Sequence, residues 1–491
     1  MSIQAARFVS LRQILIAVSI LISTHISHAQ RSIFADKTVS EAFECVYNID
    51  NEQFVAKSAL VNDEIIRRYL CEYMAVMNYT ATNNKDNYNK YMAASDAALD
   101  VVDKHKYGHT FRCNLLLHRC LVEMSNGSLM AGGMQFWKAY REFKAGEKAY
   151  ADYEGQIMLR GIFNILLSQI PEKWKGIAGF LGFDGGDLAK GFANVDDYRK
   201  RMKGVKGAYD ESLLISFANI FLSHEQVVSD DLAKQMKSSK SPVVQYVYLL
   251  SMGRQYHGAE AESVIAALPS RFYSVFPLFY HQKAKFALRG LRTHDAIAAA
   301  DKFINIYRGV SCLNDAYLIK AYAYLLDGNS EKANELAAKC VSLAAKSDVD
   351  KRTLADAERV PETDQTLLRV RMQFEYGNFY ESLTTLRGYK MPERHRIEYV
   401  FRYARAQHLM GDASHAIANY DKVISWAAND KRYFGPYSAI YAADEMIKQN
   451  KLDAAKAYVK TARQLNNGEF SKELDQRIAL TSRQIDKLEN K

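Results

Sequence analysis

Proline and long hydrophobic runs are both scarce in this chain. Only 7 of its 491 residues are proline, and these fall where helix ends or starts are expected, so they interrupt no helix. The remainder is rich in Ala, Leu, Lys and Glu, which favour helices. No stretch that follows the N-terminal segment Met1–Ala29 is long and apolar enough to cross a bilayer. The composition therefore predicts an all-α protein with no transmembrane span in the mature chain.

The sequence also lacks the signatures of common enzyme and metal sites. It has no Cys-x-x-Cys pair and no Gly-x-Ser-x-Gly nucleophile elbow. The loop Gly182–Asp187 contains three glycines and two aspartates. It lacks the lysine and hydroxyl residue of a phosphate-binding loop and the closing glutamate of a calcium loop. We interpret it as a turn, and we predict no catalytic residue, no metal site and no cofactor.

Positive charge is in modest excess. The formal net charge is +9, and removal of the segment Met1–Ala29, which holds two arginines and no acid, lowers it to +7. This value is small for the length, so nucleic acid is not the expected partner. The densest basic run is Arg199–Lys206, followed by Lys234, Lys237 and Lys240. A solvated helix end explains such a run, and contact with an anionic lipid or an acidic peptide is the alternative.

The N-terminal segment Met1–Ala29 has the layout of a secretory signal peptide. Arg7 and Arg12 precede an apolar run from Ile14 to Ile22, and Ser27-His28-Ala29 supplies small residues for cleavage. The apolar run is shorter than the about 20 residues that cross a bilayer, so a permanent anchor is only the alternative. We expect the mature chain to begin near Gln30 and to be extracytoplasmic, either periplasmic or secreted.

The second half of the chain repeats one pattern five times: an aromatic-rich helical stretch, a turn, and an Ala-rich helical stretch. The expected hairpins span Tyr280–Tyr307, Tyr317–Leu343, Leu367–Leu386, Val400–Ile424 and Ala439–Ala462. Their turns lie at Gly290, Gly328, Gly377, Gly411 and Asn450, and their small packing residues are Ala296, Ala333, Ser382, Ala416 and Ala455. Apart from the longer interval between Ala333 and Ser382, the small residues recur with a period in the mid-thirties, which is typical of tetratricopeptide-like hairpins. This pattern predicts a helical-repeat solenoid.

The rest of the chain divides around this series. Residues 30–240 are expected to form a divergent N-terminal helical array, and residues 241–491 the repeats, closed by a polar capping helix at Ser471–Leu488. The polar segment Lys346–Gln365 accounts for the one long interval and is interpreted as an exposed insertion or an extra short helix. In the N-terminal array we expect helices at Val39–Tyr47, Gln53–Val61, Asp63–Asn78, Tyr88–Val102, Thr110–Met124, Leu129–Tyr150 and Gly155–Gln169.

Six cysteines in an exported chain raise the question of disulfides. Cys312 and Cys340 lie near the two ends of one expected hairpin, which antiparallel packing brings together, so they can pair. Cys45 and Cys71 can pair if their helices are neighbours. Six buried, reduced thiols are the alternative.

Aromatic residues are dense around Pro277. Phe272, Phe276 and Tyr280 lie there together with two further rings. They either pack in the core between helical pairs or line a groove that grips a peptide or an apolar ligand.

Three stretches of the sequence, one moderately specific and two weaker, point to a known family. Gly161–Pro171 reads GIFNILLSQIP and is followed by Gly182-Phe183-Asp184-Gly185 and by Gly191. This stretch resembles the "G-x-F-N-L-x-L-S-x-x-P … G-F-x-G … G-L" segment of the tetratricopeptide repeat protein 39 and inclusion-body clearance family. Arg432–Tyr437 is similar to the family's "R-x-F-G-P-Y" ahead of its last repeat, and Val46–Asn48 is more loosely similar to its first hairpin.

The resemblance spans roughly residues 38 to 470. It implies an all-helical repeat protein without known catalytic residues that acts through protein partners. Members of the family are intracellular, whereas this chain begins with an export signal. The resemblance therefore implies a shared architecture and not a shared cellular role.

Together these observations predict an exported, non-enzymatic helical-repeat scaffold whose concave face binds a protein or peptide partner. The alternative is a binder of a small apolar or glycan ligand in a helical cleft. A hydrolase in the N-terminal half is a third hypothesis, for which no motif provides support.

Overall fold

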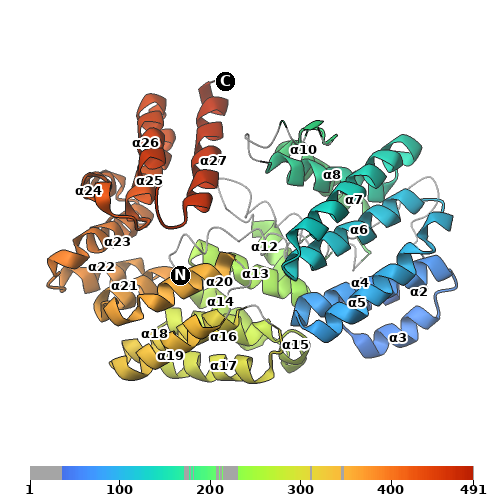
Figure 1. Ribbon diagram of the computed structural model, residues 1–491, viewed down its shortest axis with the longest axis horizontal. Helices are drawn as coiled ribbons and strands as arrows, with labels where there is room; N and C mark the ends of the chain where they lie inside the picture. Colours follow the sequence, from blue (N-terminus) through green and yellow to red (C-terminus); the bar gives the residue numbers. More distant parts are fainter. Residues whose placement is uncertain are drawn as a thin grey trace.

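The structure is a computed structural model that describes residues 36–170, 176, 179–180, 182–205, 210, 213, 230–309, 312–343 and 348–489. The predicted signal peptide lies outside these residues. Within them, 24 α-helices are joined by turns and short 3₁₀ segments, and no β-strand occurs (Figure 1). The predicted all-α class is confirmed.

The N-terminal helices form antiparallel pairs. The pairs are α2 (Lys37–Asn48) with α3 (Asn51–Ala59), α4 (Glu64–Thr82) with α5 (Lys85–Leu99), α6 (Gly108–Ser125) with α7 (Leu129–Tyr150), and α8 (Glu154–Ser168) with α10 (Leu188–Arg201). The 3₁₀ turn η2 (Val102–Lys104) connects the second and third pairs. Asp36, Asp50, Asp63 and Asn84 start the first four helices, because each side chain accepts a hydrogen bond from an N–H of the first turn.

Four shorter helices lie between the N-terminal pairs and the repeats. They are α12 (Asp230–Ser238), α13 (Pro242–Gln255), α14 (Gly258–Ala267) and α15 (Ser270–Val275). The Ser241 hydroxyl accepts from the Val244 N–H at the start of α13 and donates to the carbonyl oxygen of Tyr47 at 2.6 Å. The largest hydrophobic cluster correspondingly runs from Val39 to Ala316. The division of the chain at residue 240 stays a prediction.

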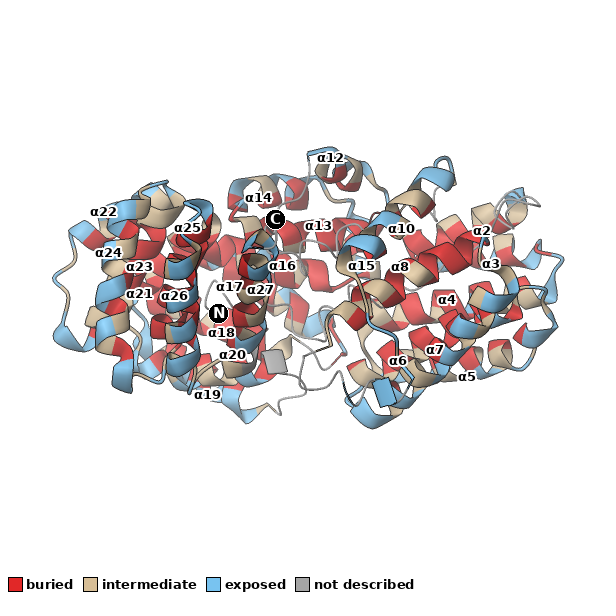
Figure 2. Cartoon of the chain, turned by 90° about the horizontal axis from the view of Figure 1, so that it is seen from above, coloured by how far each residue is buried: buried red, intermediate tan, exposed pale blue. Residues whose placement is uncertain are grey.

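All five expected repeat hairpins are present. They are α16 (Leu278–Arg289) with α17 (Thr293–Ile306), α18 (Leu313–Leu326) with α19 (Ser330–Ser342), α21 (Gln365–Tyr376) with α22 (Phe379–Arg387), α23 (Arg396–Leu409) with α24 (Ala413–Trp426), and α25 (Phe434–Lys448) with α26 (Leu452–Leu465). The 3₁₀ turns η4 (Glu393–His395) and η5 (Ala427–Asn429) lie between hairpins. The five predicted small residues are each 0% exposed. Figure 2 shows buried positions on the facing sides of the helices.

The solenoid is wound tightly enough for distant hairpins to touch. Helix α16 contacts both α18 and α21, and α14 also reaches α21. At this crossing a Cβ on Gly258 would lie 2.4 Å from the ring of Tyr376, and one on Gly377 would lie 2.1 Å from the carbonyl oxygen of Tyr256. Only glycine permits such close backbone approach.

The described part of the segment between α19 and α21 is largely helical and partly buried. It forms α20 (Asp348–Glu358) and the 3₁₀ turn η3 (Val360–Glu362), and Arg352, Thr353 and Asp356 are buried. The alternative of an extra short helix is confirmed by α20. The expectation of an exposed insertion is wrong for its buried residues, because Arg352 pairs with Glu473 and Asp356 pairs with Arg371. The predicted capping helix is α27 (Ser471–Glu489), which packs on α25 and α26. Both α20 and α27 lie inside the arc in Figure 1.

Candidate functional site

The three aromatic residues singled out in the sequence have different surroundings. Phe276 is fully buried, with its ring 4.8 Å from that of Tyr246. Tyr280 is half-buried and its ring lies 4.6 Å from that of Tyr273. Phe272 lines a cavity. Core packing accounts for Phe276, and the groove formed by all three together stays a prediction.

The cavity beside Phe272 has a volume of about 730 Å³. Its walls come from parts of the chain that are far apart in sequence: the α2–α3 turn, the end of α12, and the α14–α15 corner. Lys237, Lys240 and Arg271 line it together with one acid, Asp50. The structure therefore brings part of the basic run and one predicted aromatic residue to the same place.

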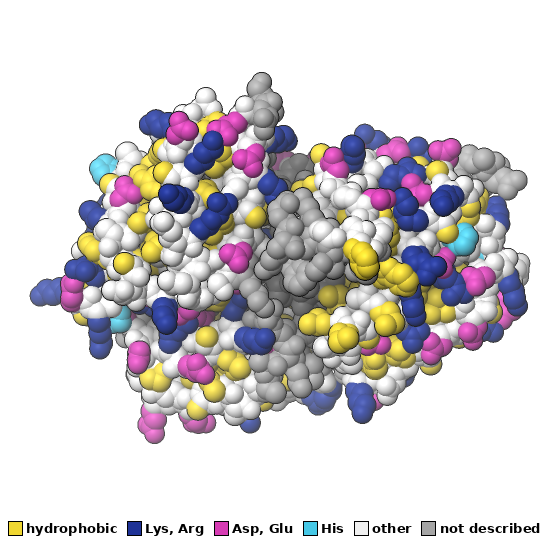
Figure 3. All heavy atoms as spheres, turned by 45° about the horizontal axis from the view of Figure 1, so that its top comes forward, with side chains coloured by type: hydrophobic (Ala, Val, Ile, Leu, Met, Phe, Trp, Pro, Cys, Tyr) yellow, Lys and Arg dark blue, Asp and Glu magenta, His cyan; other side chains and the backbone are white. Residues whose placement is uncertain are grey.

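A second feature is an apolar stripe on α7, formed by Leu129, Met130, Met134 and Trp137. Leu129, Met130 and Met134 are 63%, 91% and 58% exposed. Met130, Met134 and Trp137 follow the helical spacing of four and then three residues, so they share one face. Arg141, one turn further on, places its guanidinium carbon 4.9 Å from the Trp137 ring centroid. Figure 3 shows hydrophobic side chains gathered on the lobe of the N-terminal helices.

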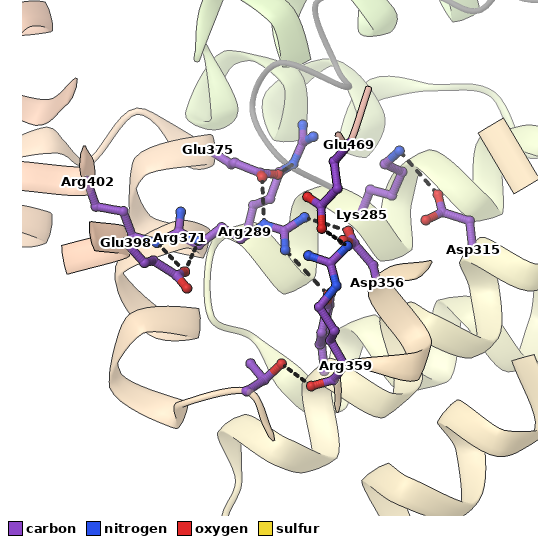
Figure 4. A network of polar contacts seen from close by, with 12 residues as sticks. Lys285, Arg289, Asp315, Asp356, Arg359, Arg371, Glu375, Glu398, Arg402 and Glu469 are labelled. Carbon is purple, nitrogen blue, oxygen red and sulfur yellow. Dashed lines mark hydrogen bonds and ion pairs between the residues drawn. The ribbon is translucent and has the colours of Figure 1, made fainter. Parts of the chain in front are cut away.

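The inner side of the repeats is occupied by a buried network of charged residues (Figure 4). Arg371 of α21 is its centre: Nη2 donates to Asp356 Oδ2 at 3.0 Å and Nε to Glu375 Oε1 at 3.2 Å. Arg289 of α16 donates to the other oxygen of Glu375 at 3.1 Å. Arg359 forms an ion pair of 2.8 Å with Glu469, just before α27. These pairs attach α20 to α21, join α21 to α16, and attach the segment before α27 to the end of α20.

The network extends to both sides of this centre. On one side Lys285 and His281 lie 3.2 Å and 2.8 Å from the same carboxylate oxygen of Asp315. Burial opposes ionisation of this carboxyl, but Lys285 and His281 outweigh it and hold the pKa of Asp315 below its usual value. On the other side Arg402 pairs with Glu398 of α23. The charged side chains on the inner side are thus paired with one another, and those of Arg289, Arg371, Glu375 and Asp356 are buried.

Asp356 differs from the other acids of the network. Burial raises the pKa of its carboxyl to about 7, against the opposing effect of Arg359. Sequence reasoning missed these residues. A signal was present, because Arg371 and Glu375 share a helix face with Leu368 and Met372, which are core residues.

The structure places Cys312 and Cys340 at the same end of the α18–α19 hairpin. Cys340 is buried, and its thiol donates to the carbonyl oxygen of Asn314 at 3.2 Å. No disulfide joins any two of the six cysteines, all of which are described. The Cys312–Cys340 and Cys45–Cys71 pairings stay predictions.

No group of three or more His, Cys, Asp or Glu residues in the described part could hold a metal ion.

The glycines of the family motif serve close packing of α8 and α10. A Cβ on Gly161 would lie 3.0 Å from the carbonyl oxygen of Gly191, and the converse distance is also 3.0 Å. The Asn164 side-chain oxygen accepts from the Asp187 N–H at 3.2 Å. Asp187, the last residue of the loop Gly182–Asp187, caps α10, because its side-chain carboxylate accepts a hydrogen bond from the Lys190 N–H. Gly182 is in a turn and residues 183–187 have no regular secondary structure, and the interpretation of the loop as a structural turn stays a prediction. Across the described ranges, no helix combines the length and hydrophobicity needed to cross a bilayer.

Comparison with known proteins adds little to this account. No protein-family model matches the chain, and no curated protein matches it. The P58(IPK) TPR domain is similar at 13% identity, covering 82% of this chain and 95% of that chain, with a TM-score of 0.23. A human IFIT1 dimer with PPP-AAAA is similar at 12% identity, covering 93% and 95%, with a TM-score of 0.29. The specific resemblance to the tetratricopeptide repeat protein 39 family stays a prediction. The stacked hairpins themselves show that the chain is a helical-repeat solenoid of the tetratricopeptide-like class.

Proposed function

We propose that this chain is an exported, non-enzymatic scaffold that binds a protein partner through the stripe on α7. The observation that carries the proposal is the exposure of Leu129, Met130 and Met134 on one helix. Contiguous exposed apolar side chains are typical of interaction sites. Methionine adds adaptability, because its flexible and polarisable side chain fits partners of different shape.

The geometry of the stripe favours a helical partner. Met130, Met134 and Trp137 repeat at the spacing that one helix presents to another. Arg141 at the end of the stripe supplies a charged contact, so an apolar helix followed by an acidic residue fits this surface. The partner class is therefore a protein segment with an amphipathic helix.

The concave face, which the sequence favoured as the binding surface, is the less favourable place. A ligand there would have to separate Arg371 from Asp356 and Glu375. Removal of one partner from a buried ion pair costs about 3–5 kcal/mol. We therefore place the partner contact on α7, outside the arc of repeats.

Export rests on the layout of the segment Met1–Ala29. If the signal is cleaved as proposed, the protein recovered outside the cytoplasm of the expressing cells begins near Gln30. An intact Met1 in the extracytoplasmic fraction, or protein found only in the cytoplasm, would remove this part of the proposal. This measurement is independent of partner binding.

Affinity capture with charge variants tests the binding surface. The wild-type chain, Met130→Asp with Met134→Asp, and a control Met410→Asp are expressed in the native cells and recovered under gentle conditions. Met410 is a suitable control because it is also exposed, at 49%, but lies on the repeats. We expect one protein to be captured by the wild type and the control and lost with the α7 variant. Equal capture by all three chains would show that the stripe is not the contact.

A further inference from the structure

We propose that the cavity between α3, α12 and α14 binds a small amphipathic anion, an apolar body that carries a carboxylate or phosphate head. This site is separate from the stripe on α7, so either proposal can fail while the other stands. Its volume of about 730 Å³ lies within the range of about 300–1,000 Å³ usual for ligand pockets.

The charges of the lining favour an anion. Lys237, Lys240 and Arg271 face a single acid, Asp50. That acid already has partners: its two oxygens accept from the backbone N–H of Gln53 at 3.2 Å and from the Gln53 amide at 2.8 Å. Lys237 lies 3.5 Å from Glu260, a pair that remains partly solvated. The cavity therefore keeps an excess of positive charge.

Arg271 is held in place at the wall. Its guanidinium carbon lies 5.5 Å from the ring centroid of Phe272, and its Nη2 donates to the carbonyl oxygen of Asn48 at 3.2 Å. A guanidinium has five N–H donors in a planar fork, so this one bond leaves donors for an oxyanion. An arginine fixed in this way loses little rotamer freedom when an anion binds.

The lysine-bearing segment is also fixed. The side-chain nitrogen of Gln245 lies within hydrogen-bonding distance of the carbonyl oxygens of Met236, Lys237 and Ser239, at 3.2, 2.8 and 2.9 Å. These bonds satisfy carbonyls at the end of α12 that would otherwise lack partners in the helix. The path of the backbone from Met236 to Ser239 therefore does not depend on a ligand.

The α14–α15 wall, which also carries Arg271, is mostly apolar. Val264, Ala267, Leu268 and Phe272 line it. A neutral apolar ligand would leave the excess positive charge of the lining unneutralised, and a glycan would leave the apolar wall without an apolar contact. A head group with negative charge on a hydrocarbon body matches both walls.

Calorimetric titration of the full chain with defined probes tests the assignment. The probes are decanoate, decyl phosphate and the neutral decanol. Two variants, Lys240→Met and Arg271→Met, each remove one positive charge from the lining. Ser263→Trp fills the cavity from the exposed face of α14. Lys234→Met is the control, because Lys234 lies on α12 but outside the lining. We expect at least one of the two anions to bind, and at least tenfold more tightly than decanol.

The charge variants test whether binding needs the positive side chains, and Ser263→Trp tests whether it needs the open volume of the cavity. We expect each charge variant to weaken anion binding about tenfold, Ser263→Trp to abolish it, and Lys234→Met to leave it unchanged. Binding of decanoate but not decyl phosphate, or the reverse, would identify the head group. The proposal is overturned if neither anion binds, if decanol binds as tightly as the anions, or if Lys240→Met and Lys234→Met behave alike. Circular dichroism and melting of each variant separate loss of binding from loss of folding.

Discussion

Replacement of Gly377 by alanine tests how tightly the solenoid is wound. Gly377 forms the turn between α21 and α22 with a φ of +109°, a backbone conformation that a residue with a Cβ adopts only with strain. A Cβ there would also lie 2.1 Å from the carbonyl oxygen of Tyr256, at the end of α13. Gly411 occupies the corresponding turn of the next hairpin with a φ of +87° and has nothing within 4 Å of its Cβ position. The two glycines differ chiefly in the contact with a distant hairpin.

The magnitudes follow from this difference. Left-handed backbone strain costs about 1–2 kcal/mol in either variant. Overpacking against a backbone atom adds about 1–3 kcal/mol, and the carbonyl of Tyr256 cannot rotate away as a flexible side chain would. We therefore expect Gly377→Ala to lower the apparent free energy of unfolding by about 2–5 kcal/mol and Gly411→Ala by about 1–2 kcal/mol.

Urea unfolding followed by circular dichroism measures both losses. Hydrogen exchange then locates them: Gly377→Ala is expected to increase exchange in α13 and α14 as well as in α21, whereas the effect of Gly411→Ala stays within its own hairpin. Equal losses in the two variants, with no change in α13, would refute the packing of the α13–α14 hairpin against α21.

Three further predictions concern the interior. Arg371→Met removes a buried partner from both Asp356 and Glu375, so we expect it to lower the free energy of urea unfolding by about 3–5 kcal/mol. The control Lys332→Met breaks an exposed pair and should change this free energy by less than about 1 kcal/mol. Similar losses in the two variants would contradict the buried network. Burial lowers the pKa of His408 from 6.5 to about 4. Between these two pH values the unfolded chain therefore binds more protons than the folded chain. The stability that comes from a neutral His408 is present above pH 6.5 and is lost as pH falls toward 4. Between pH 7 and pH 4, the free energy of unfolding of the wild type should fall by about 3 kcal/mol more than that of His408→Gln. Equal losses in the two proteins would argue against a neutral imidazole at His408. Thiol titration of the unreduced, denatured protein should find all six cysteines reactive; two fewer would indicate one disulfide, either Cys312–Cys340 or Cys45–Cys71.

The repeat hairpins could be predicted because their determinants are local. Ala296, Ala333 and Ala455 mark the inward face of each second helix, and a small or polar residue marks each turn. These signals fall within about 30 residues, the length of one hairpin. The predicted bounds of the hairpins therefore lie within a few residues of the observed ones. In the N-terminal array, Leu129–Tyr150 matches α7.

The network and the cavity could not be predicted in the same way. Arg371 meets Asp356 only because α20 folds back inside the arc, and no periodicity specifies that path. Phe272 and Lys237 were separate observations in the sequence, and only the packing of α14 beside α12 brings them to one cavity. The exposure of Met130 likewise depends on how other elements pack around α7, which the pattern of a single helix does not encode.

Photocrosslinking from the α7 stripe can detect the proposed partner contact in the cell. A photoreactive phenylalanine analogue replaces Met134 in one chain and Met410 in a control chain, and both are expressed in the native cells. The account predicts that one partner protein crosslinks at position 134, that the crosslink disappears when Met130→Asp is added, and that position 410 gives none. The same crosslinks from both positions, or none from position 134 in a chain that is folded and exported, would contradict it.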